Sequence, residues 1–184
     1  MKNLNGYIKK LEKGMEDKLF FLRHIDMNEY SLVVEFGCAN GRLLRRIESV
    51  TDKNITKLVG FDINEEIIMI AKNISPEITF TSKWDEVLTL LKHTPKKSLI
   101  IFSSVWHEIS QEYYETIFNE MKKFTTIVIR DMKAPIKGAE PIDAPTRDRI
   151  KKMVPEWQFN ELRKNGEELI IKKPCIAFYL CILI

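Results

Sequence analysis

The chain has 184 residues, of which 45% are hydrophobic and 30% are charged, and its net charge at pH 7 is +3. These values are typical of one globular domain with a sizeable core, and so small a charge does not by itself indicate nucleic-acid binding, which stays open. No apolar run approaches the ~20 residues that a membrane span requires. The first residues do not resemble a secretory signal and the three cysteines form no C-x-x-C pair. We therefore expect a cytoplasmic protein without a metal site.

The chain alternates between helical and strand patterns in its first 132 residues. Apolar residues recur at helical spacing from Leu4 to Leu22, which predicts a helical segment within residues 1–28. Strands are expected at 32–36, 57–61, 78–81, 99–102 and 126–129, with helices at 43–50, 64–74, 84–91 and 114–124. Asn64 is the expected N-cap of the second of these helices. Continuous β-branched and aromatic strands separated by helices predict a parallel sheet covered on both faces.

The last 50 residues are less regular. Residues 134–141 read as a turn-rich loop, 143–153 as a helix, and 169–171 and 176–184 as two strands. The final ten residues carry no charge. They are therefore either a buried strand or the sign of a longer chain. We expect one domain over residues 1–184, in which 30–132 bind a ligand and 133–184 close the fold.

The most informative stretch is a β-α-β pattern over residues 32–62. An apolar strand runs into a loop that contains Gly37 and Gly41, and a second strand ends at Asp62. The glycines let a ligand approach the backbone, and an acid at that strand end can accept hydrogen bonds from two ribose hydroxyls. This pattern predicts a site for an adenosine ligand.

The loop does not fit a dinucleotide. A dinucleotide site has the pattern G-x-G-x-x-G, and this chain has Ala39 and Arg42 where the second and third glycines belong. Glu35, two residues before Gly37, would repel a pyrophosphate and would suit a ligand with an ammonium group.

The motif resembles that of the class I S-adenosylmethionine-dependent methyltransferases, in their small bacterial and phage form. Glu35, Gly37 and Gly41 match the first motif of that family and Asp62 matches the second, whereas Ala39 departs from the usual middle glycine. The resemblance implies a Rossmann-like, doubly wound α/β fold, with a mostly parallel seven-stranded sheet and a C-terminal antiparallel strand pair. It implies S-adenosylmethionine as cofactor and methyl transfer to an unidentified acceptor, for which we expect a small molecule.

The same resemblance gives a set of candidate cofactor residues. They are Glu35, Gly37, Cys38, Ala39, Gly41, Asp62, Ile63, Lys83, Trp84 and Ser103. Ile63 is expected on one face of the adenine and the Ser82–Trp84 segment at its edge. Trp84 is equally well explained as a core anchor of its own helix.

Candidate catalytic residues follow the fourth strand, in the segment 103–109. Histidine side chains ordinarily titrate near neutral pH, so His107 is the candidate general base, with Glu108 to orient it or to hold the acceptor. His107 could instead cap the next helix or pack against Trp106. Arg130 and Asp131, at the end of the fifth strand, could hold the acceptor or could pair with each other or with Glu108, and we expect the structural role of anchoring loops.

Two other functions stay open beside methyl transfer. A non-catalytic module that binds S-adenosylmethionine would keep the same cofactor residues. A nicotinamide-dependent reductase is the less favoured alternative, because the dinucleotide pattern fails at Ala39 and Arg42.

Overall fold

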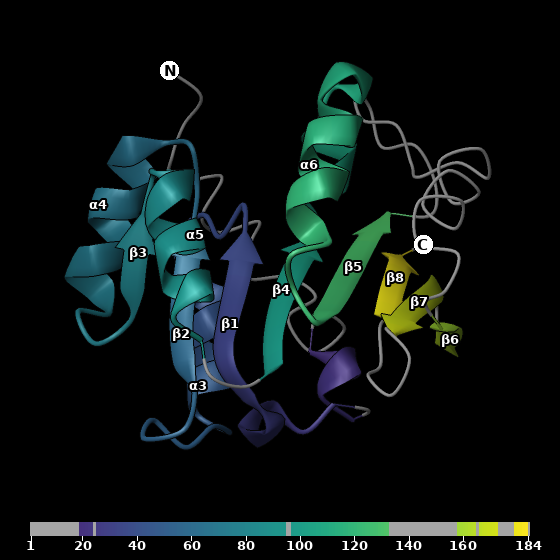
Figure 1. The fold of residues 1–184 in the computed structure, drawn as a ribbon, viewed down its shortest axis with the longest axis horizontal. Coiled ribbons are helices and arrows are strands. Elements are labelled where there is room, and N and C mark those ends of the chain that lie inside the picture. The colour runs from purple at the N-terminus through teal and green to yellow at the C-terminus, as the bar shows by residue number, and fades with distance from the viewer. Residues whose placement is uncertain are drawn as a thin grey trace. The chain divides into compact units, whose positions relative to one another are not determined.

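The chain has an α/β Rossmann-like fold in a computed structural model, in which helices alternate with parallel strands (Figure 1). The structure describes residues 19–23, 25–94, 97–132, 158–164, 166–172 and 179–183. Two compact units make up the chain, Met1–Lys96 and Lys97–Ile184. Most of the predicted N-terminal helical segment and the whole of the predicted helix over 143–153 lie outside the described residues.

Three parallel strands form the sheet of the first unit. They are β1 (Tyr30–Phe36), β2 (Lys57–Phe61) and β3 (Thr79–Thr81), and β2 lies between the other two. Apolar residues on both faces of β1 and β2 are buried, among them Leu32, Val33, Val34, Leu58 and Val59, as expected for a parallel sheet that is covered on both sides. The register places Gly60 of β2 beside Phe80 of β3.

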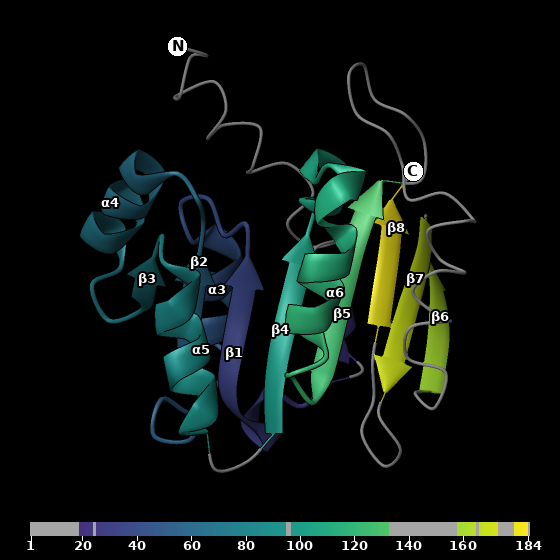
Figure 2. The same ribbon diagram turned by 45° about the horizontal axis from the view of Figure 1, so that its top comes forward.

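Helices α3 (Arg42–Glu48), α4 (Glu65–Ile74) and α5 (Trp84–Lys92) pack against these strands. In Figure 2, α5 lies in front of β1 and β2, and α3 lies behind them. The sequence predicted Asn64 as the N-cap of α4, and this is confirmed, because its side chain accepts hydrogen bonds from the backbone N–H groups of Glu66 and Ile67. The helix expected over 43–50 ends at Glu48.

The core of the first unit consists of residues on these strands and helices. Its fully buried members are Val33, Val34, Leu44, Ile47, Val59, Ala71 and Val87. Two short 3-10 helices, η1 (Phe20–Arg23) and η2 (Met27–Glu29), precede β1. The hydroxyl of buried Thr56 donates to the carbonyl of Tyr30 at 2.9 Å and so joins the start of β2 to the start of β1.

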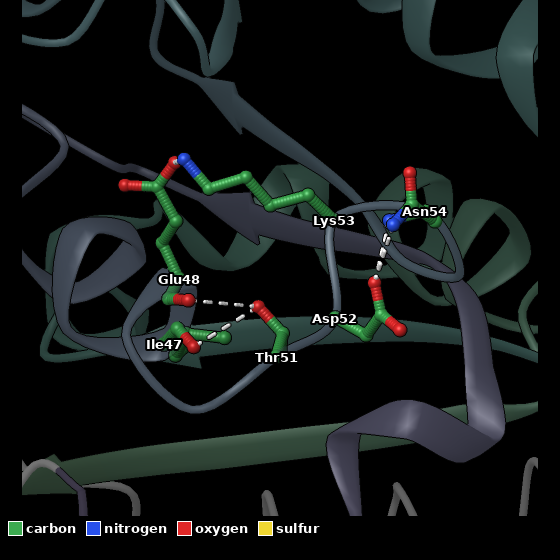
Figure 3. Close-up of polar contacts among 6 residues, drawn as sticks. All are labelled: Ile47, Glu48, Thr51, Asp52, Lys53 and Asn54. Carbon is green, nitrogen blue, oxygen red and sulfur yellow. Dashed lines mark hydrogen bonds and ion pairs between the residues drawn. The ribbon is translucent and has the colours of Figure 1, made fainter.

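The connection from α3 to β2 is held by its own polar side chains (Figure 3). The Thr51 hydroxyl donates to the carbonyl of Ile47 or Glu48, at 3.2 Å in either case, and closes the end of the helix. The Lys53 ammonium lies 2.8 Å from the Glu48 carboxylate, which raises the pKa of Lys53. This connection lies at the end of the strands opposite the glycine loop.

The second unit contains parallel strands β4 (Lys97–Ser103) and β5 (Thr126–Met132). Helix α6 (Tyr114–Met121) joins them and lies in front of them in Figures 1 and 2. Two 3-10 helices, η3 (Trp106–Glu108) and η4 (Gln111–Tyr113), lie between β4 and α6. The core of this unit is formed by Leu99, Ile100, Ile101, Phe102, Phe124, Val128 and Ile129.

Three further strands complete the second unit. They are β6 (Gln158–Lys164), β7 (Gly166–Lys172) and β8 (Tyr179–Leu183). Strand β7 is antiparallel to β5, β6 and β8, while β8 is parallel to β5. The sequence predicted strands near β7 and β8 but none at β6. Among the described residues, no helix is long and apolar enough to cross a membrane.

Candidate functional site

The loop between β1 and α3 has an unusual backbone. Gly37, Ala39 and Gly41 all have positive φ angles, of 72°, 48° and 73° respectively. Left-handed backbone is favourable for glycine but strained for alanine, so contacts elsewhere must hold Ala39 in place. The N–H groups of Gly37 and Cys38 both donate to the carbonyl of Phe61, at 2.8 and 2.9 Å, and tie the loop to the end of β2.

Asp62 holds the same loop through its side chain. Its Oδ2 accepts a hydrogen bond from the backbone N–H of Ala39 at 2.9 Å, and its Oδ1 accepts one from the N–H of Asn64 at 3.0 Å. Each carboxylate oxygen retains capacity for a further hydrogen bond, and the side chain is only half-buried. Asp62 thus fixes the strained Ala39 and can still accept two hydroxyl hydrogens.

Two carboxylates, those of Glu35 and Asp62, lie close to the loop. Glu35 is 4% exposed at the end of β1, and Cys38 is buried within the loop. Burial raises the pKa of the Cys38 thiol far above its usual range, and the charges of Glu35 and Asp62 raise it further. The thiol therefore stays protonated and unreactive. Carboxylates at this place favour a ligand with a cationic group over a pyrophosphate, and the Arg45 guanidinium also interacts with Glu35.

Gly41 and Gly60 make room for the ring of Phe80. A Cβ on Gly41 would lie 2.3 Å from Cζ of Phe80, and one on Gly60 would lie 2.5 Å from its Cδ1 and 2.8 Å from Sγ of Cys38. The two distances to carbon atoms of Phe80, 2.3 and 2.5 Å, are shorter than any carbon–carbon contact in a packed core. Gly41 is thus required by packing beneath the loop as well as by its positive φ, a role that the sequence analysis did not anticipate.

Arg45 holds the exit of the loop. Its Nη1 donates to the carbonyl of Asn40 at 2.7 Å, and the N–H of Arg45 donates to the carbonyl of Gly41 as the first turn of α3 forms. Burial of the guanidinium, and then its proximity to Arg42, lower the pKa of Arg45.

The residues predicted to surround an adenine are exposed or half-buried. Ile63 is 83% exposed directly after Asp62, and Lys83 is exposed as well. The Trp84 ring lies edge-on to the rings of Phe36 and Phe61, with centroids 5.5 and 5.1 Å away. The aromatic contacts give Trp84 a packing role, and its contact with adenine stays a prediction.

The remaining candidates belong to the second unit. Ser103 is 7% exposed, and its hydroxyl has no hydrogen-bond partner among the residues that the structure describes. Glu108 is exposed in η3, where His107 also lies, although the side chain of His107 is outside the described part. Within that part, no group of three or more His, Cys, Asp or Glu residues is arranged to hold a metal ion.

Three features of the structure, two contacts and one backbone conformation, were not predicted from the sequence. These are the Phe80 ring beneath Gly41, the bond from Arg45 to Asn40, and the left-handed backbone of Ser104, whose φ is 58°. The apolar Phe80 in a predicted strand was the one visible signal. A serine gives no sequence sign of positive φ.

Sequence comparisons give no relative, whereas the fold has many. No protein-family model matches the chain. No curated protein matches it significantly either. A structure of a SAM-dependent methyltransferase from Archaeoglobus fulgidus is similar with a TM-score of 0.60 and 17% identity, over 88% of this chain and 79% of that one.

Two other solved structures give the same result. Human N-acetylserotonin methyltransferase has a TM-score of 0.59 at 13% identity, over 90% of this chain and 53% of that chain. The methyltransferase domain of a bacterial Hen1 protein has a TM-score of 0.58 at 12% identity, over 83% and 89% of the two chains. The chain therefore has the fold found in S-adenosylmethionine-dependent methyltransferases.

Proposed function

We propose that this protein binds S-adenosylmethionine at the loop 37–41 and transfers its methyl group to a small-molecule acceptor. The observation that carries the proposal is the pair of carboxylates, Glu35 and Asp62, that flank a loop of alternating left-handed residues. Their field suits a ligand with a sulfonium and an ammonium group and opposes a dinucleotide pyrophosphate. The likeness of the fold to solved methyltransferases supports the same conclusion.

Each part of the loop has a distinct task in this proposal. Asp62 accepts hydrogen bonds from the two ribose hydroxyls. Each of its carboxylate oxygens has a lone pair left for this, because among the described residues each accepts only one bond, from Ala39 or from Asn64. Glu35 compensates the charge of the ammonium group, directly or through water. Ala39 is held by Asp62 before any ligand arrives, so little loop ordering opposes binding.

The chemistry needs little beyond placement. S-adenosylmethionine supplies a methyl group already activated on a positively charged sulfur, so positioning of the acceptor accounts for most of the rate. His107 as general base and Glu108 as its partner remain part of the proposal, carried by their place in the sequence after β4. We also retain the prediction that the protein is cytoplasmic. The seven strands that the sequence predicted are not retained, because the described residues contain eight, β1–β8.

Two assays test this function. The first is calorimetric titration with S-adenosylhomocysteine and, separately, with NAD. The second follows tritium from methyl-labelled S-adenosylmethionine into the small-molecule and macromolecular fractions of a cell extract. We expect binding of S-adenosylhomocysteine alone, with label in the small-molecule fraction. Binding without transfer would indicate the non-catalytic module, and binding of NAD alone would indicate the reductase.

A further inference from the structure

Strand β4 ends in a strained turn at Ser104. Its φ of 58° is left-handed, a conformation that residues other than glycine, asparagine and aspartate seldom adopt. Such a backbone persists only where surrounding contacts determine it, and these turns gather at functional sites. The turn leads directly into η3, which carries Trp106, His107 and Glu108.

Arg130 supplies the contacts that hold this turn. The backbone N–H of Ser104 donates to the carbonyl of Arg130 at 2.7 Å, and Nη1 of Arg130 donates to the Ser104 hydroxyl at 3.3 Å. Arg130 is itself 1% exposed and lies opposite Ser103 in the register of β4 and β5. One buried arginine thus holds Ser104 by both its main chain and its side chain.

The left-handed turn changes the direction of the side chains that follow. Successive side chains of a strand alternate between faces, so a straight continuation would point Ser104 away from the face that Ser103 shares with Arg130. The turn brings the Ser104 hydroxyl to Arg130 instead.

Two residues later, Trp106 is fixed by a second set of contacts. Its ring packs against Phe102, Tyr114 and Phe118, with centroids 5.5, 5.1 and 5.3 Å away. The segment 104–108 is thereby held at Ser104 by polar contacts and at Trp106 by aromatic ones. The N–H of Glu108 donates to the carbonyl of Val105 at 3.0 Å and completes the turn of η3.

We propose that Arg130 and Ser104 are positioning residues for methyl transfer, because their contact sets the path of the segment 104–108. This inference rests on the proposed function, since it gives the segment a reaction to serve. It extends the function by assigning a task to a buried arginine and to a strained serine, neither of which has to contact the acceptor.

The test compares three variants at serine positions. Ser104→Val removes the hydroxyl and introduces a β-branched side chain, which disfavours a left-handed backbone. Ser104→Asn is the rescue variant, because asparagine tolerates that backbone and keeps a side-chain acceptor for Arg130. Ser110→Val is the matched control, because Ser110 is exposed and extended and its side chain caps no helix.

The position of the segment is read from fluorine NMR on protein labelled with 5-fluorotryptophan. The chain has three tryptophans, whose signals are assigned with single Trp→Phe variants. We expect Ser104→Val to shift or broaden the Trp106 signal and to leave the Trp84 signal of the first unit unchanged. Ser104→Asn and Ser110→Val should both keep the parent spectrum. An unchanged Trp106 signal in Ser104→Val would overturn the inference.

The link to catalysis is read from kinetics on the same proteins. Ser104→Val should lower the turnover of labelled methyl groups by about 10²-fold, the usual effect of a small misplacement, with affinity for S-adenosylhomocysteine within about two-fold of the parent. Ser104→Asn should restore most of the turnover. If the Trp106 signal moves and turnover does not, Ser104 is structural only and the inference is wrong.

Arg130 is tested in the same way, with Arg130→Lys as the variant that keeps a donor and Arg130→Met as the variant that loses it. Arg130→Lys should retain more turnover than Arg130→Met, and equal turnover in the two would contradict the role of the guanidinium. If the parent protein neither binds S-adenosylhomocysteine nor transfers methyl groups, the proposed function fails. The fluorine spectra still decide whether Arg130 and Ser104 hold the segment.

Discussion

Replacing Gly41 with alanine should destabilise the protein through two separable effects. A Cβ there would lie 2.3 and 2.4 Å from Cζ and Cε1 of the buried Phe80 ring, and the backbone φ is 73°. Forcing a methyl group into a packed core costs ~1–3 kcal/mol. A left-handed alanine costs ~1–2 kcal/mol. We therefore expect Gly41→Ala to lower the free energy of unfolding by about 2–5 kcal/mol.

Two companion variants separate the steric term from the conformational one. A Cβ on Gly60 would meet the same ring at 2.5 Å, and Gly60 has no positive φ, so Gly60→Ala should cost only the steric ~1–3 kcal/mol. Phe80→Leu removes ring atoms that the Gly41 methyl would meet. In that background, Gly41→Ala should therefore cost only the conformational ~1–2 kcal/mol.

The assay is urea denaturation of the parent, the three single variants and the double variant Gly41→Ala/Phe80→Leu, followed by circular dichroism. The cycle yields the coupling free energy between positions 41 and 80, which should favour the double variant by more than ~0.5 kcal/mol. If Gly41→Ala costs the same in both backgrounds, Phe80 does not limit the space at Gly41, and the packing explanation is refuted.

Three further predictions concern the same unit. Ala39→Gly should raise the free energy of unfolding by up to ~1 kcal/mol, because glycine relieves the strain at φ 48° but loses more entropy on folding; a destabilised variant would contradict the strain. Asn64→Ala should cost ~1 kcal/mol in urea denaturation by removing the α4 cap, and no loss would refute its contribution. The Cys38 thiol ionises near pH 8.5 when unfolded and stays protonated when folded, so stability should fall above that pH by up to ~1.4 kcal/mol per pH unit. Cys38→Ala should lose that part of the slope between pH 8.5 and 10, and an unchanged slope would contradict the buried, protonated thiol.

The β-α-β pattern was predictable because each part leaves a separate mark on the sequence. The apolar strands, the Asn64 cap and the position of Asp62 follow from periodicity and local hydrogen bonding, and they do not depend on distant residues. The motif also pointed to Gly37 and Gly41. It predicted that both are glycines because a ligand approaches the backbone there, and it did not predict the packing of Phe80 against Gly41.

What the sequence did not reveal depends on contacts between distant positions. Phe80 lies beneath Gly41 because β3 pairs with β2, a register that no local pattern encodes. Ser104 is left-handed because Arg130, 26 residues later, holds it on the neighbouring strand. The strand at 158–164 has five polar or charged residues in seven, so it lacks the apolar alternation by which the other strands were predicted.

The central claim is that Asp62 and the loop 37–41 bind S-adenosylmethionine, and calorimetric titration with S-adenosylhomocysteine tests it most directly. The parent is compared with Asp62→Asn and with the control Asp52→Asn. Both variants lose one negative charge, but Asp52 lies before β2 and Asp62 lies after it, beside the loop. We predict that the parent and Asp52→Asn bind with similar affinity. Asp62→Asn should bind about 10–100-fold more weakly, as expected for loss of one charge-assisted hydrogen bond, because asparagine keeps one of the two acceptor oxygens. No binding by the parent, or equal affinity in all three proteins, would contradict the account.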